Sequence, residues 1–296
     1  MHTFFERIDV FRNIVYDDFS HNYTINGVRT VSVTKVTGSA KPPFDNMAVS
    51  QGSATKELVA ERIEEIRKER GAEYEPTQEE LDNIRNAIPK ADVDARAEKL
   101  RIKWARTNLI STEKGSAAHK YIESAMANKF ERYPEASIRA VFGGEDPVKE
   151  KYDAVVRHMD AFKRDIAGKM IPIKSELVIG SPRYMLCGMI DQIFWNNKSG
   201  KFELWDWKTN AKFETSSKYH LQSPVSHLMQ CHLDEYSLQL ACYKKMFTEM
   251  TGIPLGNSYL CWFCETEPTY RVFKCKDLQA EAELLIKKSM AERGIK

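Results

Sequence analysis

The chain has 296 residues, with 44 Lys and Arg against 42 Asp and Glu and a formal net charge of +2. This balance excludes attraction to nucleic acid through net charge, so any such attraction has to come from local clusters of basic residues. No apolar run approaches the roughly 18 residues of a membrane-spanning helix, and residues 1–9 carry acids early, unlike a signal or transit peptide. We therefore expect an intracellular, cytoplasmic protein without a membrane partner.

The first third of the chain combines a hairpin signal with helical patterns. Residues 22–36 read as two short strands around an Asn26-Gly27 turn. Apolar residues at helical spacing predict helices over 53–70 and 77–108, which glycine and proline residues interrupt. We expect residues 1–110 to form one hairpin and helical region.

The second of these helical patterns becomes basic toward its end. Between residues 96 and 106, five basic residues accompany a single acid, and Arg101, Lys103 and Arg106 are the last of the five. Such a run is commonly a solvated helix face, and the alternative is a surface that follows DNA phosphates. We keep these three residues as candidates for DNA contact.

Helices are expected next along the chain, followed by strands. A helix should open at Gly115, after the start signal around Ser111, and continue to about Phe130; another is expected over 147–167. Runs rich in β-formers predict a meander of three strands over 173–179, 184–194 and 202–207. The remaining elements are a helix over 233–251, strands over 258–264 and 269–275, and a closing helix over 278–292.

Charged residues lie inside the apolar strands of this meander. Glu176 lies in the first strand, Asp191 in the second, and Asp206 and Lys208 in the third. Because strand side chains alternate, Asp206 and Lys208 project to one side and Trp207 to the other. Carboxylates hold hard cations through oxygen, and a nearby ammonium can orient the attacking water or offset developing charge. The pattern predicts the site of a metal-dependent nuclease.

A salt-bridged cluster of Asp191, Asp206 and Lys208 without a metal is the alternative interpretation. The apolar neighbours of both acids place them near a core boundary, where unpaired charge is costly. A metal ion or another cation has to balance that charge.

All six cysteines fall between residues 187 and 275, and only Cys261 and Cys264 have the spacing of a metal or redox pair. The aromatic and apolar residues around this pair are typical of a buried strand. We predict buried cysteines there, and an iron–sulfur or zinc site is the alternative.

Four motifs follow one another along the chain: Glu176, Gly188-x-x-Asp191, Asp206-x-Lys208-Thr209 and Gln239-Leu-Ala-Cys-Tyr243. This series resembles the RecB-like branch of the PD-(D/E)XK nuclease superfamily, and its last motif is similar to the Gln-apolar-x-x-Tyr motif of that branch. The chain is also similar to the mitochondrial genome-maintenance exonucleases and related phage exonucleases. The specific match runs from about Trp104 to Tyr243.

The resemblance implies a role for each matching residue. It makes Asp191 and Asp206 metal-binding acids, Lys208 the catalytic lysine, and Glu176 a supporting catalytic acid. His119 matches a metal-ligating histidine of the family, although taken alone it could be an ordinary helix histidine.

Three further residues are expected to lie beside this site. Gln239 and Tyr243, four apart on one helical face, would position the DNA strand or the scaffold of the site. Glu123, one turn after His119, either hydrogen-bonds near the site or is a surface acid.

The implied fold is α/β, with a restriction-endonuclease-like core over residues 111–296 in which helices flank a mixed central sheet. Residues 1–110 would form part of the DNA channel. The implied activity is Mg²⁺-dependent hydrolysis of DNA from free ends, in recombination, repair or end processing, with Mn²⁺ as a substitute ion. A recombinase or single-strand-annealing protein is the expected partner. The cysteines do not match the iron–sulfur subset of the branch, so no iron–sulfur cluster is expected.

Other interpretations remain open at this point. The protein could be a structure- or sequence-specific endonuclease on the same fold, a non-catalytic DNA-binding module, or a redox or metal-cluster protein built on Cys261 and Cys264. The long segment between Lys208 and Gln239 could cover the substrate or pack against the N-terminal elements.

Overall fold

The computed structural model describes residues 2–18 and 20–295, and the chain folds into two compact units. The larger unit contains residues 1–42 and 113–296, and the smaller one contains residues 43–112. This division differs from the predicted boundary at residue 110 in one respect. The first 42 residues belong to the larger unit, because their hairpin pairs with the central sheet.

Eight strands of the described residues form one mixed sheet in the larger unit. They are β1 (Ile14–Asp17), β2 (Asn22–Ile25), β3 (Val28–Ser32), β4 (Met170–Ser181), β5 (Leu186–Asn196), β6 (Lys201–Lys208), β7 (Leu255–Trp262) and β8 (Arg271–Lys274). The strand order is β1-β2-β3-β5-β6-β7-β8, and β4 pairs with β5 outside this path. The predicted hairpin at Asn26 joins β2 to β3, and the predicted meander is β4-β5-β6, antiparallel throughout.

The centre of the sheet contains a fork along β5. Its first residues pair with β3 in parallel, through Leu186 and Cys187. Its last residues pair with β6, and the ladder runs from Asn196↔Lys201 to Gln192↔Trp205. Residues 188–191 lie between these two partners, where β5 and β6 separate. Backbone N–H and C=O groups at such a point do not all have a partner in a neighbouring strand, so they are available for other hydrogen bonds.

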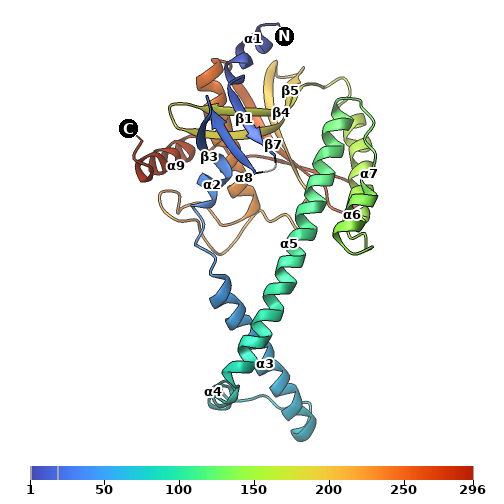
Figure 1. Cartoon of the computed structure of the whole chain (residues 1–296), viewed down its shortest axis with the longest axis vertical. Coiled ribbons are helices and arrows are strands. Elements are labelled where there is room, and N and C mark those ends of the chain that lie inside the picture. The colour runs from blue at the N-terminus through green and yellow to red at the C-terminus, as the bar shows by residue number, and fades with distance from the viewer. Residues whose placement is uncertain (1, 19, 296) are drawn as a thin grey trace. The chain divides into compact units, whose positions relative to one another are not determined.

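Helices cover both faces of this sheet (Figure 1). One face packs against α2 (Val33–Gly38), α8 (His232–Thr251) and α9 (Gln279–Glu292). The other packs against α7 (Lys149–Ile166) and the C-terminal end of α5 (Lys90–Met126), which run side by side. The predicted α/β fold with a mixed sheet between helices is therefore confirmed. Of the helices that the structure describes, none has both the length and the apolar character needed to cross a membrane.

The smaller unit is helical, as its sequence pattern predicts. It consists of α3 (Asn46–Arg70), α4 (Gln78–Ala87) and the first part of α5. The N-terminus of α4 is fixed by a capping box, in which Thr77 and Glu80 each bond to the other's backbone N–H. The break between α4 and α5 falls at Pro89, which cannot donate a helical hydrogen bond.

The prediction of a new helix at Gly115 is wrong, because α5 continues without interruption to Met126. Residues 111–119 contain small residues but no proline, and one internal glycine costs a helix only about 1 kcal/mol relative to alanine. The glycine also allows a close approach: a Cβ at Gly115 would lie 3.7 Å from Thr209 Oγ1. The helix ends at Met126 and not at the predicted Phe130.

Other predicted boundaries also change. The second hairpin strand ends at Ser32 rather than at residue 36, because the Ser32 side chain accepts from the Lys35 N–H and caps α2. The sequence pattern did not indicate α1 (His2–Ile8), the short 3₁₀ helix Asp9–Phe11 or α6 (Glu135–Val141).

The segment between β6 and α8 packs against the body of the larger unit. Its residues Leu221, Val225 and Leu228 are buried in the main core. The Gln222 N–H donates to the Ala40 carbonyl, 2.6 Å away, at the end of α2, and Lys288 of α9 donates to the Ser223 carbonyl at 2.9 Å. These contacts favour the packing interpretation of this segment over a cover for the substrate.

Candidate metal centre

The end of the β5–β6 ladder positions the two central acids. The last ladder pair is Gln192↔Trp205, so Asp191 and Asp206 are the first residues beyond it on their strands. The Trp207 N–H donates to Asp191 Oδ2 at 2.8 Å. The Asp191 side chain therefore takes the place of the missing strand partner, and this fixes its carboxylate in the fork.

Three side chains from three different elements meet at this point. His119 of α5, Glu176 of β4 and Asp191 of β5 each offer a ligand atom, and these atoms all lie within 4.8 Å of one another. His119 Nδ1 lies 3.7 Å from Asp191 Oδ2. Two carboxylates and one imidazole can hold a divalent cation such as Mg²⁺ or Mn²⁺.

The backbone at Glu176 has an unusual conformation. In the β4–β5 register the neighbouring pairs are Ser175↔Gln192 and Leu177↔Ile190, which leaves Glu176 opposite Asp191. Glu176 has φ = +46°, in the left-handed region that is rare for residues other than glycine. Such a conformation costs on the order of 1–3 kcal/mol and is common at functional sites. Here it occurs at a residue that offers a candidate metal ligand.

The positive charge near the carboxylates of this centre does not balance their negative charge. Burial, followed by the negative charge of Asp206, raises the pKa of Asp191 well above its usual value, and Lys208 only partly opposes this. Burial, and then the charges of Glu123 and Asp206, raise the pKa of Glu176 to about 7. A bound cation would favour the ionised form of both acids.

His119 is in the form that binds metal ions. Desolvation, followed by the positive charge of Lys208, lowers the pKa of His119 below its usual value. A neutral imidazole has a lone pair available for a cation. The centre thus combines a neutral histidine with acids that repel one another.

Asp206 and Lys208 form a pair beside these three residues. Asp206 is buried, and its Oδ2 lies 2.6 Å from Lys208 Nζ. The Lys208 ammonium also lies 4.1 Å from the centre of the Tyr236 ring of α8. Desolvation lowers the pKa of Lys208, but the charges of Asp206 and Asp191 outweigh it, so the pKa is raised. Lys208 is therefore protonated at neutral pH.

The strand alternation predicted for β6 is confirmed. Lys208 faces Tyr236 of α8, whereas Trp205 and Trp207 are buried in the cluster that α5 and α7 cover. The sequence assigned metal binding to Asp206, but the three donors within 4.8 Å of one another include Glu176 in its place. A ligand role for Asp206 stays a prediction.

Gln239 and Tyr243 lie beside the centre. Gln239 Nε2 donates to the Tyr243 hydroxyl at 2.9 Å. The Tyr243 ring packs directly on Gly188 of β5, since a Cβ at that position would lie 2.3 Å from Tyr243 Cε1. Burial and the charge of Asp206 raise the pKa of Tyr243 well above its usual value, so the hydroxyl keeps its proton.

The remaining predicted residues have different surroundings. Glu123 is exposed on α5, and its charge contributes to the raised pKa of Glu176. Arg101, in the smaller unit, pairs with Glu98 and donates to the Ser50 hydroxyl of α3 at 2.9 Å. Arg101 therefore links α5 to α3 within that unit.

Lys103 and Arg106 lie on the same helix as Arg101, and both are exposed. Their contact with DNA remains a prediction, as does that of Arg101.

Sequence patterns gave no signal for the contacts that hold the chain after Lys208. The Phe263 N–H donates to the Lys208 carbonyl at 2.8 Å, and Trp262 Nε1 donates to the Asn210 carbonyl at 2.7 Å. Cys264 Sγ lies 3.5 Å from the Ala211 carbonyl. The segment that follows β7 thus supports the segment that follows β6.

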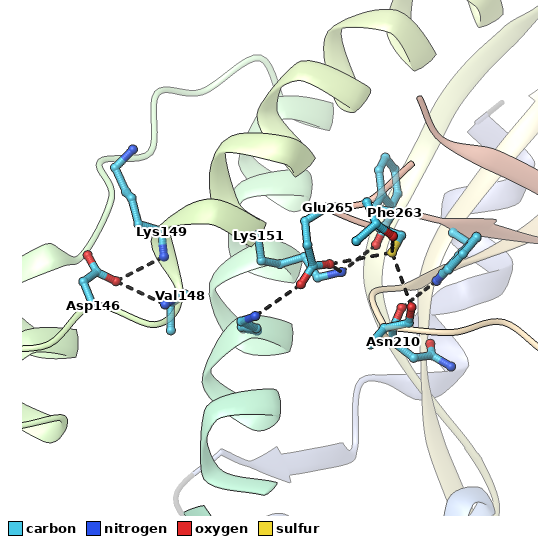
Figure 2. Close-up of polar contacts among 12 residues, drawn as sticks. Asp146, Val148, Lys149, Lys151, Asn210, Phe263 and Glu265 are labelled. Atoms are coloured by element: carbon cyan, nitrogen blue, oxygen red, sulfur yellow. Dashed lines mark hydrogen bonds and ion pairs between the residues drawn. The ribbon is translucent and has the colours of Figure 1, made fainter. Parts of the chain in front are cut away.

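A buried lysine holds this supporting segment in turn (Figure 2). Lys151 of α7 is 1% exposed, and its Nζ donates to the Phe263 carbonyl at 3.0 Å. The same ammonium lies 2.5 Å from Glu265, which Lys114 of α5 approaches to 3.2 Å. Nothing in the local sequence distinguishes Lys151 from an exposed helical lysine.

The predicted burial of the paired cysteines is confirmed. Cys261 lies in β7 and Cys264 two residues beyond its end, and both are buried. Burial raises the pKa of Cys261 well above its usual value, which favours the neutral thiol.

No protein-family model and no curated protein matches this chain. Among solved structures, the crystal structure of "Putative exonuclease" from Eubacterium rectale is similar with a TM-score of 0.42 and 15% identity, over 62% of this chain and 65% of that one. The chain thus spans less than two thirds of that protein. The crystal structure of SSO0001 is similar with a TM-score of 0.27 and 12% identity, over 59% of this chain and 84% of that one. Both TM-scores are below 0.5, so the function proposed below rests on the geometry of the site.

Proposed function

We propose that this protein is a metal-dependent deoxyribonuclease of the RecB-like PD-(D/E)XK type that hydrolyses DNA from free ends. One observation carries the proposal: donor atoms of His119, Glu176 and Asp191 lie within 4.8 Å of one another. The Asp206–Lys208 pair lies next to them. Action from ends, and a role in recombination, repair or end processing, come from the resemblance of the motifs.

The residues of the centre would have different roles in phosphodiester hydrolysis. His119, Glu176 and Asp191 would hold Mg²⁺ or Mn²⁺, with Asp206 as a further ligand or as the partner of Lys208. The ion supplies Lewis-acid stabilisation of phosphate charge and lowers the pKa of a bound water. Because Lys208 is protonated, it fits a role as a donor that stabilises negative charge on the phosphate, and not as a general base.

Degradation of labelled DNA tests the proposal. Single-stranded and duplex DNA labelled at the 5′ or 3′ end, and a covalently closed circle, are incubated with Mg²⁺ or with chelator. We expect degradation of the linear substrates only, and only with the metal. Asp191→Asn should remove the activity, whereas Asp9→Asn, at an exposed aspartate, is the matched control.

Other results of this assay would indicate a different function or contradict the proposal. Cleavage of the closed circle would identify an endonuclease on the same fold. Binding of DNA without cleavage would indicate the non-catalytic module. Activity that survives both chelation and Asp191→Asn would sink the proposal. A recombinase or single-strand-annealing partner is tested separately, by co-purification with this chain.

A further inference from the structure

A groove of about 820 Å³ lies in the larger unit. The hairpin β2–β3, α2, the turn before β5 and the end of α9 line it. Its lining includes the residues Asn22, Tyr23, Arg29, Thr30, Lys35 and Arg293. Binding sites of roughly 300–1,000 Å³ hold a drug-sized ligand, so a groove of this size has room for a few nucleotides of one strand.

Basic residues outnumber acids in this lining. Arg29, Lys35 and Arg293 accompany one carboxylate, Glu292. This is a local positive cluster in a chain whose formal net charge is only +2. Such a cluster is what a phosphate-binding surface requires when net charge does not supply the attraction.

The three cations differ in what their donors already contact. Two guanidinium nitrogens of Arg293 donate to the carbonyls of Met185 and Tyr184, each at 2.8 Å, so Arg293 anchors the wall. Arg29 donates through one nitrogen to Asn22 Oδ1 at 2.6 Å. Lys35 is exposed, and its ammonium forms no ion pair with a residue that the structure describes. Lys35 and the remaining donors of Arg29 are therefore available to a ligand.

Aromatic rings adjoin these cations. Tyr23 lines the groove, and its ring centre lies 4.6 Å from that of Tyr16. His21, which also lines the groove, lies 2.6 Å from the Tyr16 hydroxyl. Half-buried rings beside basic side chains are the combination that binds single strands, with bases on the rings and phosphates on the cations.

The groove and the candidate metal centre are connected by β5. Met185 lines the groove and directly precedes β5, the strand that carries Asp191. At about 3.3 Å per residue, Asp191 is roughly 20 Å of chain beyond Met185. Val31 and Ser32 of β3 also line the groove, and they pair with Leu186 and Cys187 of β5. Burial is the main cause of the raised pKa of Tyr23, and the charges of Glu176 and Asp191 are among the smaller contributions.

We propose that this groove binds single-stranded DNA next to the metal centre, with Lys35 and Arg29 on phosphates and Tyr23 stacked on a base. The assignment deepens the proposed function, on which it rests, by naming the substrate class. The strand lies along β2 and β3 and approaches the metal centre past Tyr23.

Binding of fluorescein-labelled oligothymidylate, followed by anisotropy in chelator, tests the groove without requiring catalysis. Lys35→Glu and Arg29→Glu should each raise the Kd by roughly tenfold. Each should also reduce the slope of log Kd against log salt by about 0.7, as expected when one single-strand phosphate contact is lost. Lys198→Glu, at an exposed lysine in the turn between β5 and β6, is the matched control for the charge change.

Tyr23 is tested by two substitutions. Tyr23→Leu should weaken binding by about tenfold, because it removes the stacking surface, and Tyr23→Phe should restore it. Unchanged affinity in Lys35→Glu, Arg29→Glu and Tyr23→Leu overturns the proposal. Duplex DNA that competes as well as oligothymidylate, through the same residues, overturns the assignment to single strands.

Hydrolysis of bis(p-nitrophenyl) phosphate by the wild-type protein separates the two proposals. If the protein cleaves this small diester with Mg²⁺ or Mn²⁺ but the groove variants bind oligothymidylate like wild type, the proposed nuclease function is supported and the proposed groove is contradicted. If the diester is not cleaved but Lys35→Glu loses oligothymidylate binding, the proposed groove is supported and the proposed nuclease function is contradicted.

Discussion

Two sets of charged side chains in the larger unit, most of them partly buried, have opposite surroundings. Glu176 and Asp191 lie near further carboxylates, and burial together with those charges raises the pKa of both. Glu265 lies between Lys151 and Lys114. Burial raises its pKa, but the hydrogen bond and the charge of Lys151 outweigh burial and lower the pKa to about 2.

This difference separates a binding site from a structural anchor. Acids that repel one another reduce the stability of the fold, and a cation from outside relieves that repulsion. Glu265 already has its cations within the chain, so it needs none from outside. The comparison therefore supports Glu176 and Asp191 as part of the proposed ion site, and Glu265 as part of an anchor that holds helices to the sheet.

The largest expected effect is on catalysis. Asp191→Asn should reduce the proposed deoxyribonuclease activity by about a thousandfold or more, because the variant loses a proposed metal ligand. The amide oxygen can still accept the Trp207 N–H, and one of the repelling charges is gone, so the melting temperature without metal should stay the same or rise. Calorimetric titration with Mn²⁺ and thermal denaturation measure the two effects. A stable variant that binds Mn²⁺ like wild type would contradict the ligand role.

In contrast to Asp191→Asn, a substitution in the Lys151–Glu265 pair, the structural anchor, should lower the stability of the fold. Lys151→Met leaves Glu265 without its main partner, and breaking a buried ion pair costs about 3 kcal/mol of unfolding free energy. Chemical denaturation measures this loss. Lys149→Met is the matched control, since Lys149 lies on the same helix in an exposed pair with Asp153 and should change stability by less than about 1 kcal/mol. Equal losses in both variants would contradict the anchor.

The contact between Tyr243 and β5 gives a smaller effect. Gly188→Ala places a Cβ 2.3 Å from the Tyr243 ring. Overpacking of this kind costs about 2 kcal/mol, and relief by movement of Tyr243 would disturb the metal centre. We expect lower stability and lower activity together. Gly200→Ala is not a suitable control, because Gly200 has φ = +63°; Gly38→Ala, in a helix with open space around the glycine, is suitable.

The pH dependence of stability should also differ in sign between the two sets. The folded-state pKa of Glu265 is lowered from 4.5 to about 2, so its contribution is complete above pH 4.5 and is lost as the pH falls toward 2. The pKa of Glu176 is raised from 4.5 to about 7, so the metal-free protein should lose stability as the pH rises from 4.5 to 7.

Denaturation curves of Glu265→Gln and Glu176→Gln against wild type, across pH 3 to 8 in chelator, measure both slopes. Glu265→Gln should approach wild-type stability at the acid end, and Glu176→Gln should exceed wild-type stability at the alkaline end. Identical slopes in all three proteins would remove the distinction between the two sets.

Local patterns were sufficient to predict much of this fold. The runs of β-forming residues in β4, β5 and β6 and the Asn26-Gly27 turn depend on neighbouring residues, so the sequence shows them directly. The side of β6 that carries Lys208 follows from the side-chain period of two in a strand. The continuity of α5 through Gly115 could not be predicted in this way. Signals such as Ser111 and Gly115 are also tolerated inside a helix whose neighbours are good helix formers.

The sequence by itself determined which strands form the meander and which of their residues carry charge, because backbone geometry links each residue to its neighbours. Only the tertiary structure decided that Glu176 joins His119 and Asp191, and that Lys151 is buried against the chain beyond β7. These contacts join elements far apart in the sequence, and each depends on how helices pack on the sheet. The local hydrophobic pattern of the sequence does not show that packing.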